Sequence, residues 1–176
     1  MRKLVESTFM SLDGVISNPQ EWSPPYWDDE HAAYGTKLLL AADALLLGRA
    51  TYEGFVQAWP SRTGDFADRI NSLPKYVASN TLTEATWNAT ILAADAAEAV
   101  ARLKDEPGEN ILKFGTGELD RTLIANNLLD ELHIWLFPVV AGTGTRLPEG
   151  LDLVHLNLVG ETRFESGIVV LTYGPK

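Results

Sequence analysis

The chain has 176 residues, of which 45% are hydrophobic, and this is enough for one domain with a substantial core. It contains no cysteine, which excludes disulfides, thiolate zinc sites and cysteine nucleophiles. The formal net charge of −10 argues against non-specific nucleic-acid binding, because the phosphate backbone requires a basic surface, but a few local donors could still hold a phosphorylated cofactor.

The first ten residues, MRKLVESTFM, lack the long apolar core of a signal peptide, and no run in the chain approaches membrane-spanning length. We therefore expect a soluble, cytoplasmic protein. The histidines His31, His133 and His155 lie far apart and do not show metal-ligand spacing, so no metal site is predicted.

The first strand is predicted over residues 4–9, and it should stop at residues 11–14, because an Asp-Gly pair favours a turn. Asp13 is therefore expected at a strand end. From Val15 to Tyr26, several prolines and Trp22 indicate an aromatic-bearing loop rather than a regular element. Loops of this kind often border functional sites.

A helix is predicted from Asp28 to about Ala42, with Asp28, Asp29 and Glu30 at its N-terminal end, as the helix dipole prefers. Acids in this position usually cap the helix. A catalytic or substrate-binding carboxylate among them, with Asp29 as our candidate, is the less favoured alternative, because a proton-transfer acid should be partly buried beside the substrate.

Residues 44–47, with the sequence ALLL, are typical of a buried strand, and Gly48-Arg49-Ala50-Thr51 is a turn that leads into a helix ending near Trp59. Arg49 suits bidentate contact with a phosphate, and Thr51 can cap the helix or donate to an anion. Taken alone, however, the two residues fit a surface arginine and an ordinary cap better. A short helix over residues 65–72 follows.

The next strand, residues 76–78, ends in Ser79-Asn80-Thr81, which are three small hydrogen-bonding side chains. Ligands of open α/β sheets gather beyond the carboxyl ends of strands, so this is another possible contact point. Turn chemistry explains these residues equally well. A strand over residues 90–92 and a helix over residues 96–104 come next.

A glycine turn then joins a strand over residues 111–114 to a helix that ends near Asn126. Gly115, Thr116 and Gly117 form this turn, and the first amides of the following helix could hold an anion such as a diphosphate. The alternative, at about even odds, is that the glycines only permit a sharp turn. Glu118 suits the helix dipole but would repel a phosphate at the same place.

After this helix the pattern changes to strands over residues 132–139, 153–161 and 168–173, the last two forming a hairpin through Ser166-Gly167. The chain is therefore predicted to be α/β for its first two-thirds and antiparallel β at its end. The apolar closing strands, with Trp135 and Phe137, suggest a surface that pairs two subunits, so we expect a homodimer.

The order of motifs, SLDGVI, ALLLGRATYEGF, YVASNT and ILKFGTGEL followed by a closing hairpin, resembles the dihydrofolate reductase superfamily. It looks most similar to stand-alone relatives of the reductase domain of riboflavin biosynthesis, the C-terminal domain of the bifunctional deaminase-reductase. The resemblance covers nearly the whole chain. It implies one α/β domain with a mostly parallel central sheet of about eight strands, flanked by helices, and NADPH lying across the strand ends.

The resemblance also implies residue roles in cofactor binding. Gly48, Arg49 and Thr51 match the family's G-R-x-T turn, which holds cofactor phosphates at a helix start. Ser79 and Asn80 match the strand end that approaches the adenosine 2′-phosphate.

The glycine turn matches the turn under the diphosphate, so Gly115, Thr116 and Gly117 are expected to bind the cofactor, with Phe114, Glu118 and Leu119 around them. Phe9 and Ile16 would line the nicotinamide region. Asp13 lies in the S-L-D-G segment that borders the active site, where it could orient the substrate or relay a proton, and Trp22 falls in the loop that covers the site.

These expectations lead to two functional hypotheses. The first is an NADPH-dependent reductase that transfers hydride to a C=N or C=O bond of a small heterocyclic substrate of pterin or pyrimidine type. The second is a non-catalytic nucleotide-binding or assembly protein that kept the fold. Val15 supports the second hypothesis, because the riboflavin reductases carry a basic residue at that position. Glu118 also supports the second hypothesis, because its carboxylate would repel a phosphate.

Overall fold

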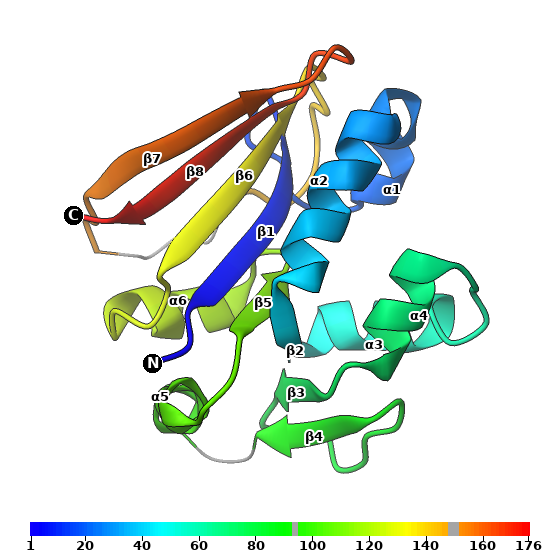
Figure 1. The fold of residues 1–176 in the computed structure, drawn as a ribbon. Helices are drawn as coiled ribbons and strands as arrows, with labels where there is room; N and C mark the ends of the chain where they lie inside the picture. Colours follow the sequence, from blue (N-terminus) through cyan, green and yellow to red (C-terminus); the bar gives the residue numbers. More distant parts are fainter. Residues whose placement is uncertain (93–94, 148–151) are drawn as a thin grey trace.

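An eight-stranded sheet runs through the molecule, with the strand order β4-β3-β2-β5-β1-β6-β8-β7. The structure is a computed structural model that describes residues 1–92, 95–147 and 152–176. Figure 1 shows the elements in this order: β1 (Leu4–Ser11), α1 (Pro19–Trp22), η1 (Pro24–Tyr26), α2 (Asp29–Leu40), β2 (Ala42–Gly48), α3 (Arg49–Ala58), α4 (Asp65–Ser72), β3 (Lys75–Ala78), β4 (Ala89–Leu92), α5 (Ala96–Asp105), β5 (Asn110–Phe114), α6 (Glu118–Ala125), β6 (Glu131–Phe137), β7 (Leu156–Arg163) and β8 (Val169–Pro175).

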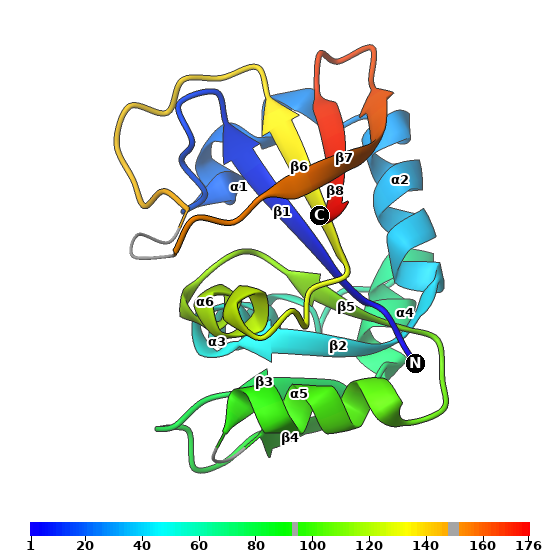
Figure 2. The ribbon, with the colours of Figure 1, turned by 90° about the vertical axis from the view of Figure 1, so that its left-hand side faces the viewer.

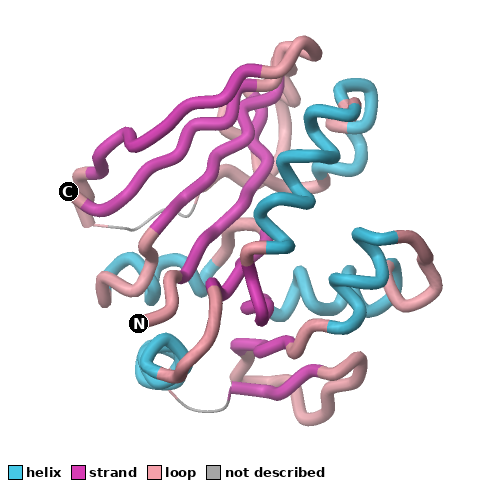
Figure 3. Tube along the Cα trace, in the orientation of Figure 1, coloured by secondary structure: helices cyan, strands magenta, loops and turns pink. Residues whose placement is uncertain are grey.

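The sheet is parallel from β4 to β6 and antiparallel at its β8 and β7 end. The predicted mostly parallel sheet with a closing hairpin is therefore confirmed. Strand β1 lies in the middle, where Leu4 pairs with Ile111 of β5 and Val5 pairs with Glu131 of β6. Figure 3 shows the strands as one layer between the helices.

Helices cover both faces of the sheet, with α5 and α6 in front and α2, α3 and α4 behind in Figure 2. The run of leucines in β2 follows from this arrangement, because a strand buried on both faces needs apolar side chains at every position. Leu45 and Leu47 pack into the core beneath α2, α3 and α4. Leu46 points the other way and packs against α5 and α6.

Capping carboxylates start two of the helices, and the sequence predicted an acidic cap for the first of them, α2. Asp28 accepts a 2.8 Å hydrogen bond from the amide of His31 at the start of α2. Asp95 accepts bonds of 2.8 and 3.2 Å from the amides of Ala97 and Glu98 at the start of α5. Each bond satisfies an amide that has no acceptor inside the helix.

Three details differ from the prediction. The segment expected to be an irregular loop contains helix α1 and the 3-10 turn η1, because Pro19 and Pro24 sit at the first helical positions, where their fixed φ is favourable. Strand β7 begins at Leu156, three residues later than expected.

The third difference concerns the predicted subunit contact. Trp135 and Phe137 are only 2% and 0% exposed, because they pack against Phe164, Ile168 and Val170 inside the molecule, so they cannot pair two subunits. Period-two patterning does not show whether one or both faces of a strand are covered. The exposed apolar side chains of this region lie on and before β7 instead: Leu153, Val154, Leu156, Leu158 and Val159.

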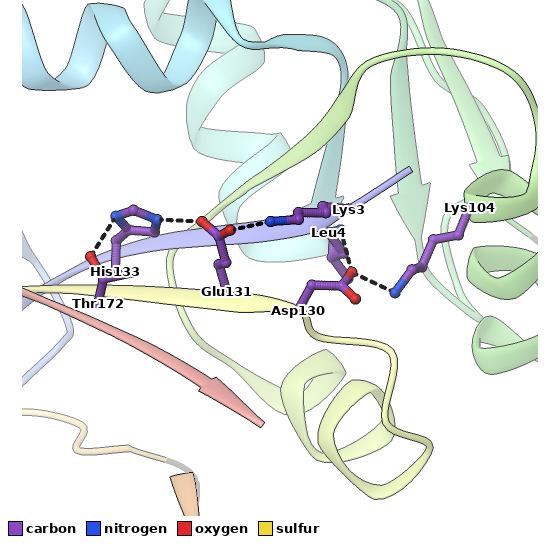
Figure 4. A network of polar contacts seen from close by, with 7 residues as sticks. All are labelled: Lys3, Leu4, Lys104, Asp130, Glu131, His133 and Thr172. Atoms are coloured by element: carbon purple, nitrogen blue, oxygen red, sulfur yellow. Dashed lines mark hydrogen bonds and ion pairs between the residues drawn. The ribbon is translucent and has the colours of Figure 1, made fainter. Parts of the chain in front are cut away.

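A polar network fastens the edge of the sheet where β1 and β6 begin (Figure 4). Asp130 accepts bonds from the Leu4 amide at 2.7 Å and from the Lys104 ammonium at 2.5 Å. Glu131 accepts a 2.8 Å bond from Lys3 and lies 3.3 Å from Nε2 of His133. These contacts join β1, β6 and α5 at the sheet edge opposite to the one where β2, β3 and β5 end.

Candidate functional site

A cleft of about 440 Å³ lies beyond the carboxyl ends of β2, β3 and β5. We call it the strand-end cleft and define it by the corners at residues 48–51, 78–81 and 115–120 that line it. The three strands are neighbours and parallel, so their carboxyl ends reach the same edge of the sheet. Open α/β sheets bind their ligands at such edges.

Ten of the predicted site residues meet in this cleft, namely Gly48, Arg49, Thr51, Ser79, Asn80, Gly115, Thr116, Gly117, Glu118 and Leu119. The three turns therefore meet in the structure, while the roles of these residues toward a cofactor remain predictions. The predicted residues Phe9, Asp13, Ile16, Trp22, Asp29 and Phe114 do not line the cleft.

The glycines leave the backbone of the cleft open. Within the described chain, and apart from their sequence neighbours, no atom lies within 4 Å of where a Cβ would stand on Gly48 or Gly117. Gly117 has extended backbone angles that any residue adopts, so the protein's own packing does not require a glycine there. Gly115 differs, because its φ is +70° and a Cβ on it would stand 3.5 Å from the Thr51 hydroxyl.

The charges of the cleft suit a phosphorylated ligand in part. Gly48 and Gly117 precede α3 and α6, so the unpaired first amides of two helices point a partial positive charge at the cleft. Arg49 adds a cation; its guanidinium contacts the Thr81 hydroxyl and donates a 2.7 Å bond to Glu53. Glu118 places a largely exposed carboxylate at the same edge, which opposes an anion.

The β3 corner is shaped by Ser79. Its hydroxyl accepts bonds of 3.3 and 3.0 Å from the amides of Thr81 and Leu82, which folds the chain back after the strand. This is the turn chemistry that the sequence offered as one explanation. Asn80 is exposed at the tip of the turn and lines the cleft.

A buried charged cluster that the sequence analysis missed lies beneath the glycine turn. Glu6 of β1, Lys113 of β5 and Asp120 of α6 are 1%, 2% and 1% exposed. The Lys113 ammonium lies 2.8 Å from Asp120 and 3.5 Å from Glu6, and it also contacts the Gly115 carbonyl. The available signal was a glutamate and a lysine inside otherwise uncharged strands.

This cluster holds the glycine turn directly. The Thr116 hydroxyl donates a 2.6 Å bond to Oε1 of Glu6, and the Gly117 amide donates a 2.5 Å bond to Oδ2 of Asp120. Burial raises the pKa of the Glu6 carboxyl to about 8; the charge of Lys113 opposes the rise, and a hydrogen bond with Asp120 adds to it.

Asp13 fastens two loops to each other. Its carboxylate accepts bonds from the Ser11 hydroxyl at 2.7 Å and from the amides of Ala141 and Gly142 at 2.9 and 2.8 Å. The bond from Ser11, followed by that from Ala141, lowers the pKa of Asp13 to about 2. Asp13 is therefore ionised at neutral pH, and its role toward a substrate remains a prediction.

The other predicted residues lie around an aromatic cluster between β1, α2 and β6. The rings of Phe9 and Trp22 lie 4.9 and 5.4 Å from that of Phe137. The imidazole of His31 packs edge-on to Phe9 and is stacked on Trp27, and its Nε2 is buried without a hydrogen-bond partner in the described residues.

The remaining three predicted residues are placed differently. Phe114 packs against Phe55 of α3, with 5.5 Å between their rings. The Ile16 amide donates a 2.8 Å bond to the Thr145 carbonyl. Asp29 is exposed in the first turn of α2, where the neighbouring Asp28 provides the cap. In the described residues, no three His, Asp or Glu side chains are arranged to hold a metal ion.

The chain matches a protein family along almost its full length. The model of the RibD C-terminal domain matches residues 2–170. The chain belongs to this family. Two Bacillus subtilis relatives support the assignment: YyaP is 30% identical over 98% of this chain and 94% of its own length, and YwjB is 29% identical over 95% of each chain. The resemblance seen in the sequence motifs is thereby confirmed.

Solved structures share the fold of this RibD C-terminal domain at low sequence identity. A Shewanella sp. PV-4 protein named for riboflavin biosynthesis has a TM-score of 0.74 and 24% identity, covering 100% of this chain and 99% of its own. A pyrimidine reductase-like protein of Corynebacterium diphtheriae has a TM-score of 0.68 and 12% identity, covering 98% and 91%.

The third structure is a Thermotoga maritima diaminohydroxyphosphoribosylaminopyrimidine deaminase/5-amino-6-(5-phosphoribosylamino)uracil reductase. It has a TM-score of 0.66 and 14% identity, and the match covers 99% of this chain and 57% of the enzyme. At these identities, the structural matches establish the fold alone.

No helix among the described residues is long and apolar enough to cross a membrane.

Proposed function

We propose that this protein is an NADPH-dependent reductase that transfers hydride to a C=N or C=O bond of a small heterocycle of pterin or pyrimidine type. The convergence of three strand-end corners and two helix starts in one cleft carries the proposal. Membership of the RibD C-terminal domain family supports it.

The residues of the cleft fit the phosphorylated part of such a cofactor. Arg49 and the first amides of α3 and α6 would hold the diphosphate, and the open backbone at Gly117 would let it approach closely. Ser79 and Asn80 would lie at the adenosine 2′-phosphate. When bound, the cofactor supplies the hydride, and the protein supplies binding, orientation and exclusion of water.

The substrate side of the proposal rests on the aromatic cluster. Phe9 and Ile16 would border the nicotinamide, and Trp22 and Asp29 are the candidate substrate contacts. Asp13, which holds the 11–14 turn against residues 141–142, would border the active site and orient the substrate or relay a proton.

Binding of NADPH, followed by its fluorescence, tests the proposal. We expect saturable binding, a loss of at least about tenfold in affinity for Gly117→Ala, and a similar loss for Arg49→Ala. Gly54→Ala is the matched control, because Gly54 also has no atom within 4 Å of an added Cβ in the described chain but lies within α3, outside the cleft. Equal affinity of Gly117→Ala and Gly54→Ala for NADPH would contradict a close approach of the cofactor at Gly117.

The second candidate is a nucleotide-binding or assembly protein without catalysis. It is supported by Glu118, which opposes a phosphate, and by Val15, which is 1% exposed and forms a bridge with Arg146 instead of offering a cation. Arg49→Ala and Gly117→Val discriminate between the candidates. A reductase should lose cofactor affinity in these variants, whereas an assembly protein should keep its oligomeric state.

The broader properties predicted from the sequence belong to this proposal as well. The continuous sheet supports one domain over residues 1–176. A cytoplasmic location and a small-molecule substrate, with no nucleic-acid or membrane partner, remain expectations. We also propose a homodimer, now through the exposed apolar residues of β7.

A further inference from the structure

The buried cluster beneath the glycine turn contains more negative than positive groups. If Glu6, Lys113 and Asp120 were all ionised, two carboxylates would face one ammonium, and the cluster would carry a net negative charge. All three side chains are at most 2% exposed. An unbalanced charge at such depth is strongly unfavourable, so a carboxyl group that can bind a proton does so.

The contacts indicate which carboxyl holds the proton. Asp120 has the nearer ammonium, at 2.8 Å, and accepts the Gly117 amide bond at 2.5 Å; both favour its charged form. The Lys113 ammonium lies further from Glu6, at 3.5 Å from its Oε2. The other oxygen of Glu6, Oε1, accepts a 2.6 Å bond from a neutral group, the Thr116 hydroxyl. Glu6 is therefore the protonated partner.

The second oxygens of the two carboxyl groups complete the arrangement. Within the described part of the chain, Oε2 of Glu6 and Oδ1 of Asp120 are buried, and the Lys113 ammonium lies 3.5 Å from the first and 2.8 Å from the second. A proton on Oε2 of Glu6 needs an acceptor, and Oδ1 of Asp120 is a carboxylate oxygen in the same cluster. One shared proton satisfies both atoms and leaves the cluster neutral.

We propose that Glu6 and Asp120 share one proton at neutral pH and that the resulting neutral cluster, held by Lys113, positions the glycine turn for an anionic ligand. Glu6 fixes the Thr116 hydroxyl, and Asp120 fixes the Gly117 amide. These are positioning residues, because they act through the turn. The effect on a ligand rests on the proposed function, whereas the shared proton does not.

Loss of this proton should weaken anion binding. The charged groups that face Glu6 are Lys113 from β5 and Asp120 from α6, and the neighbouring strand β6 places the apolar Leu132 beside it. Ionised Glu6 would put an uncompensated negative charge under the start of α6, where the diphosphate is proposed to lie. We expect roughly fivefold to twentyfold weaker NADPH binding above the titration of Glu6.

The first measurement needs no ligand. In protein labelled with ¹³C at glutamate side chains, the carboxyl carbon of Glu6 should titrate near pH 8. Its signal is assigned by its absence from Glu6→Gln. A titration near the ordinary value of 4.5 overturns the proposal, whatever the protein binds.

The second measurement follows the Kd for NADPH from pH 7 to 9.5, a range that begins above the titration of phosphate monoesters at about 6. Wild-type affinity should fall across this range, while Glu6→Gln, which mimics the protonated acid, should bind equally well throughout. Glu98→Gln is the control, because Glu98 pairs with Arg102 on the exposed face of α5, and it should behave as wild type.

The outcomes separate the two proposals. If NADPH does not bind at any pH, the proposed function fails, but the ¹³C titration still decides whether the proton is shared. If NADPH binds with the same pH dependence in wild type and Glu6→Gln, the positioning role is wrong and the reductase proposal stands.

Discussion

Nε of Arg49 donates a 2.7 Å hydrogen bond to Oε1 of Glu53, one helical turn further along α3. The only guanidinium that lines the described part of the strand-end cleft is thus paired with a carboxylate. Glu53→Gln should release Arg49 for an anion and tighten NADPH binding about twofold to fivefold at low salt.

Titration of NADPH at about 20 mM and about 500 mM salt checks this prediction. The gain in affinity should shrink at the higher salt concentration, because the Debye length of the solution falls to about 3 Å near 1 M and the charges are screened. Glu98→Gln removes the acid of an equivalent pair, Arg102–Glu98 of α5, which does not line the cleft, and should leave the Kd unchanged. Unaltered or weaker binding by Glu53→Gln would show that the pair holds Arg49 in its binding orientation.

Asp13→Asn should loosen the loop that contains Ala141 and Gly142. Oδ2 of Asp13 accepts a 2.8 Å bond from the Gly142 backbone amide. Asparagine has an NH₂ group at this position, which cannot accept a hydrogen bond, so the bond to Gly142 is lost. Hydrogen exchange at the two amides should become about tenfold faster. Asp29→Asn, at an exposed position in α2, is the control and should exchange as wild type.

The same contact should depend on pH with a defined sign. The pKa of Asp13 is lowered from 3.8 to about 2, so its contribution to stability is complete above pH 4 and disappears as pH falls through 2. Amide exchange at Ala141 and Gly142 should therefore accelerate below pH 4 beyond the intrinsic rate in wild type and stay level in Asp13→Asn. Parallel profiles would contradict the assignment.

Asp130→Ala should destabilise the fold without affecting the cleft. The Lys104 side chain is 5% exposed and would keep only the Leu128 carbonyl as a partner, at 2.7 Å. Since Asp130 itself is one-third exposed, we expect a loss of about 2 kcal/mol, less than for a fully buried pair. Urea unfolding measures this loss.

Asp105→Ala, at the end of the same helix α5, is the matched control and should change the free energy of unfolding by less than about 0.5 kcal/mol. The network (Figure 4) lies where β1 and β6 begin, whereas the cleft lies where β2, β3 and β5 end. The folded Asp130→Ala protein should therefore keep its affinity for NADPH. A loss of both stability and affinity would mean that the two edges are coupled.

The proposed homodimer should depend on β7. Leu158 and Val159 are 54% and 61% exposed on an edge strand whose outer backbone groups can pair with a second copy. The double substitution Leu158→Lys and Val159→Lys should convert a dimer to a monomer in sedimentation experiments. Leu40→Lys, at a 62% exposed position at the end of α2, should leave the mass unchanged. A monomeric wild type would rule the dimer out.

Much of the fold could be predicted because its signals are local. The strand–glycine–helix pattern at residues 44–59 and 111–125 fixes two strands whose carboxyl ends share an edge, and this places Gly48 near Gly117 without knowledge of any contact. The run Leu45–Leu47 shows that both faces of its strand are covered. The family resemblance supplied the mostly parallel sheet of about eight strands, whereas the order of the strands comes from the structure.

The missed features depend on partners that are distant in the sequence. Asp13 accepts bonds from residues 141 and 142, and the residues next to Asp13 in the sequence do not predict these contacts. Glu6 and Lys113 are the charged residues of otherwise uncharged strands, but only the pairing of β1 with β5 shows that they meet beneath the turn. The exposure of Trp135 was misjudged because a strand pattern does not reveal what lies on its far side.

The central position of β1 has a consequence for synthesis of the protein. Strand β1 leaves the ribosome well before β5 and β6, the two strands with which it pairs. The β2, β3 and β4 part can associate earlier, but the nascent chain must keep an apolar N-terminal segment without its neighbours until most of the chain has emerged. Chaperone contact during translation should therefore concentrate on residues 4–11.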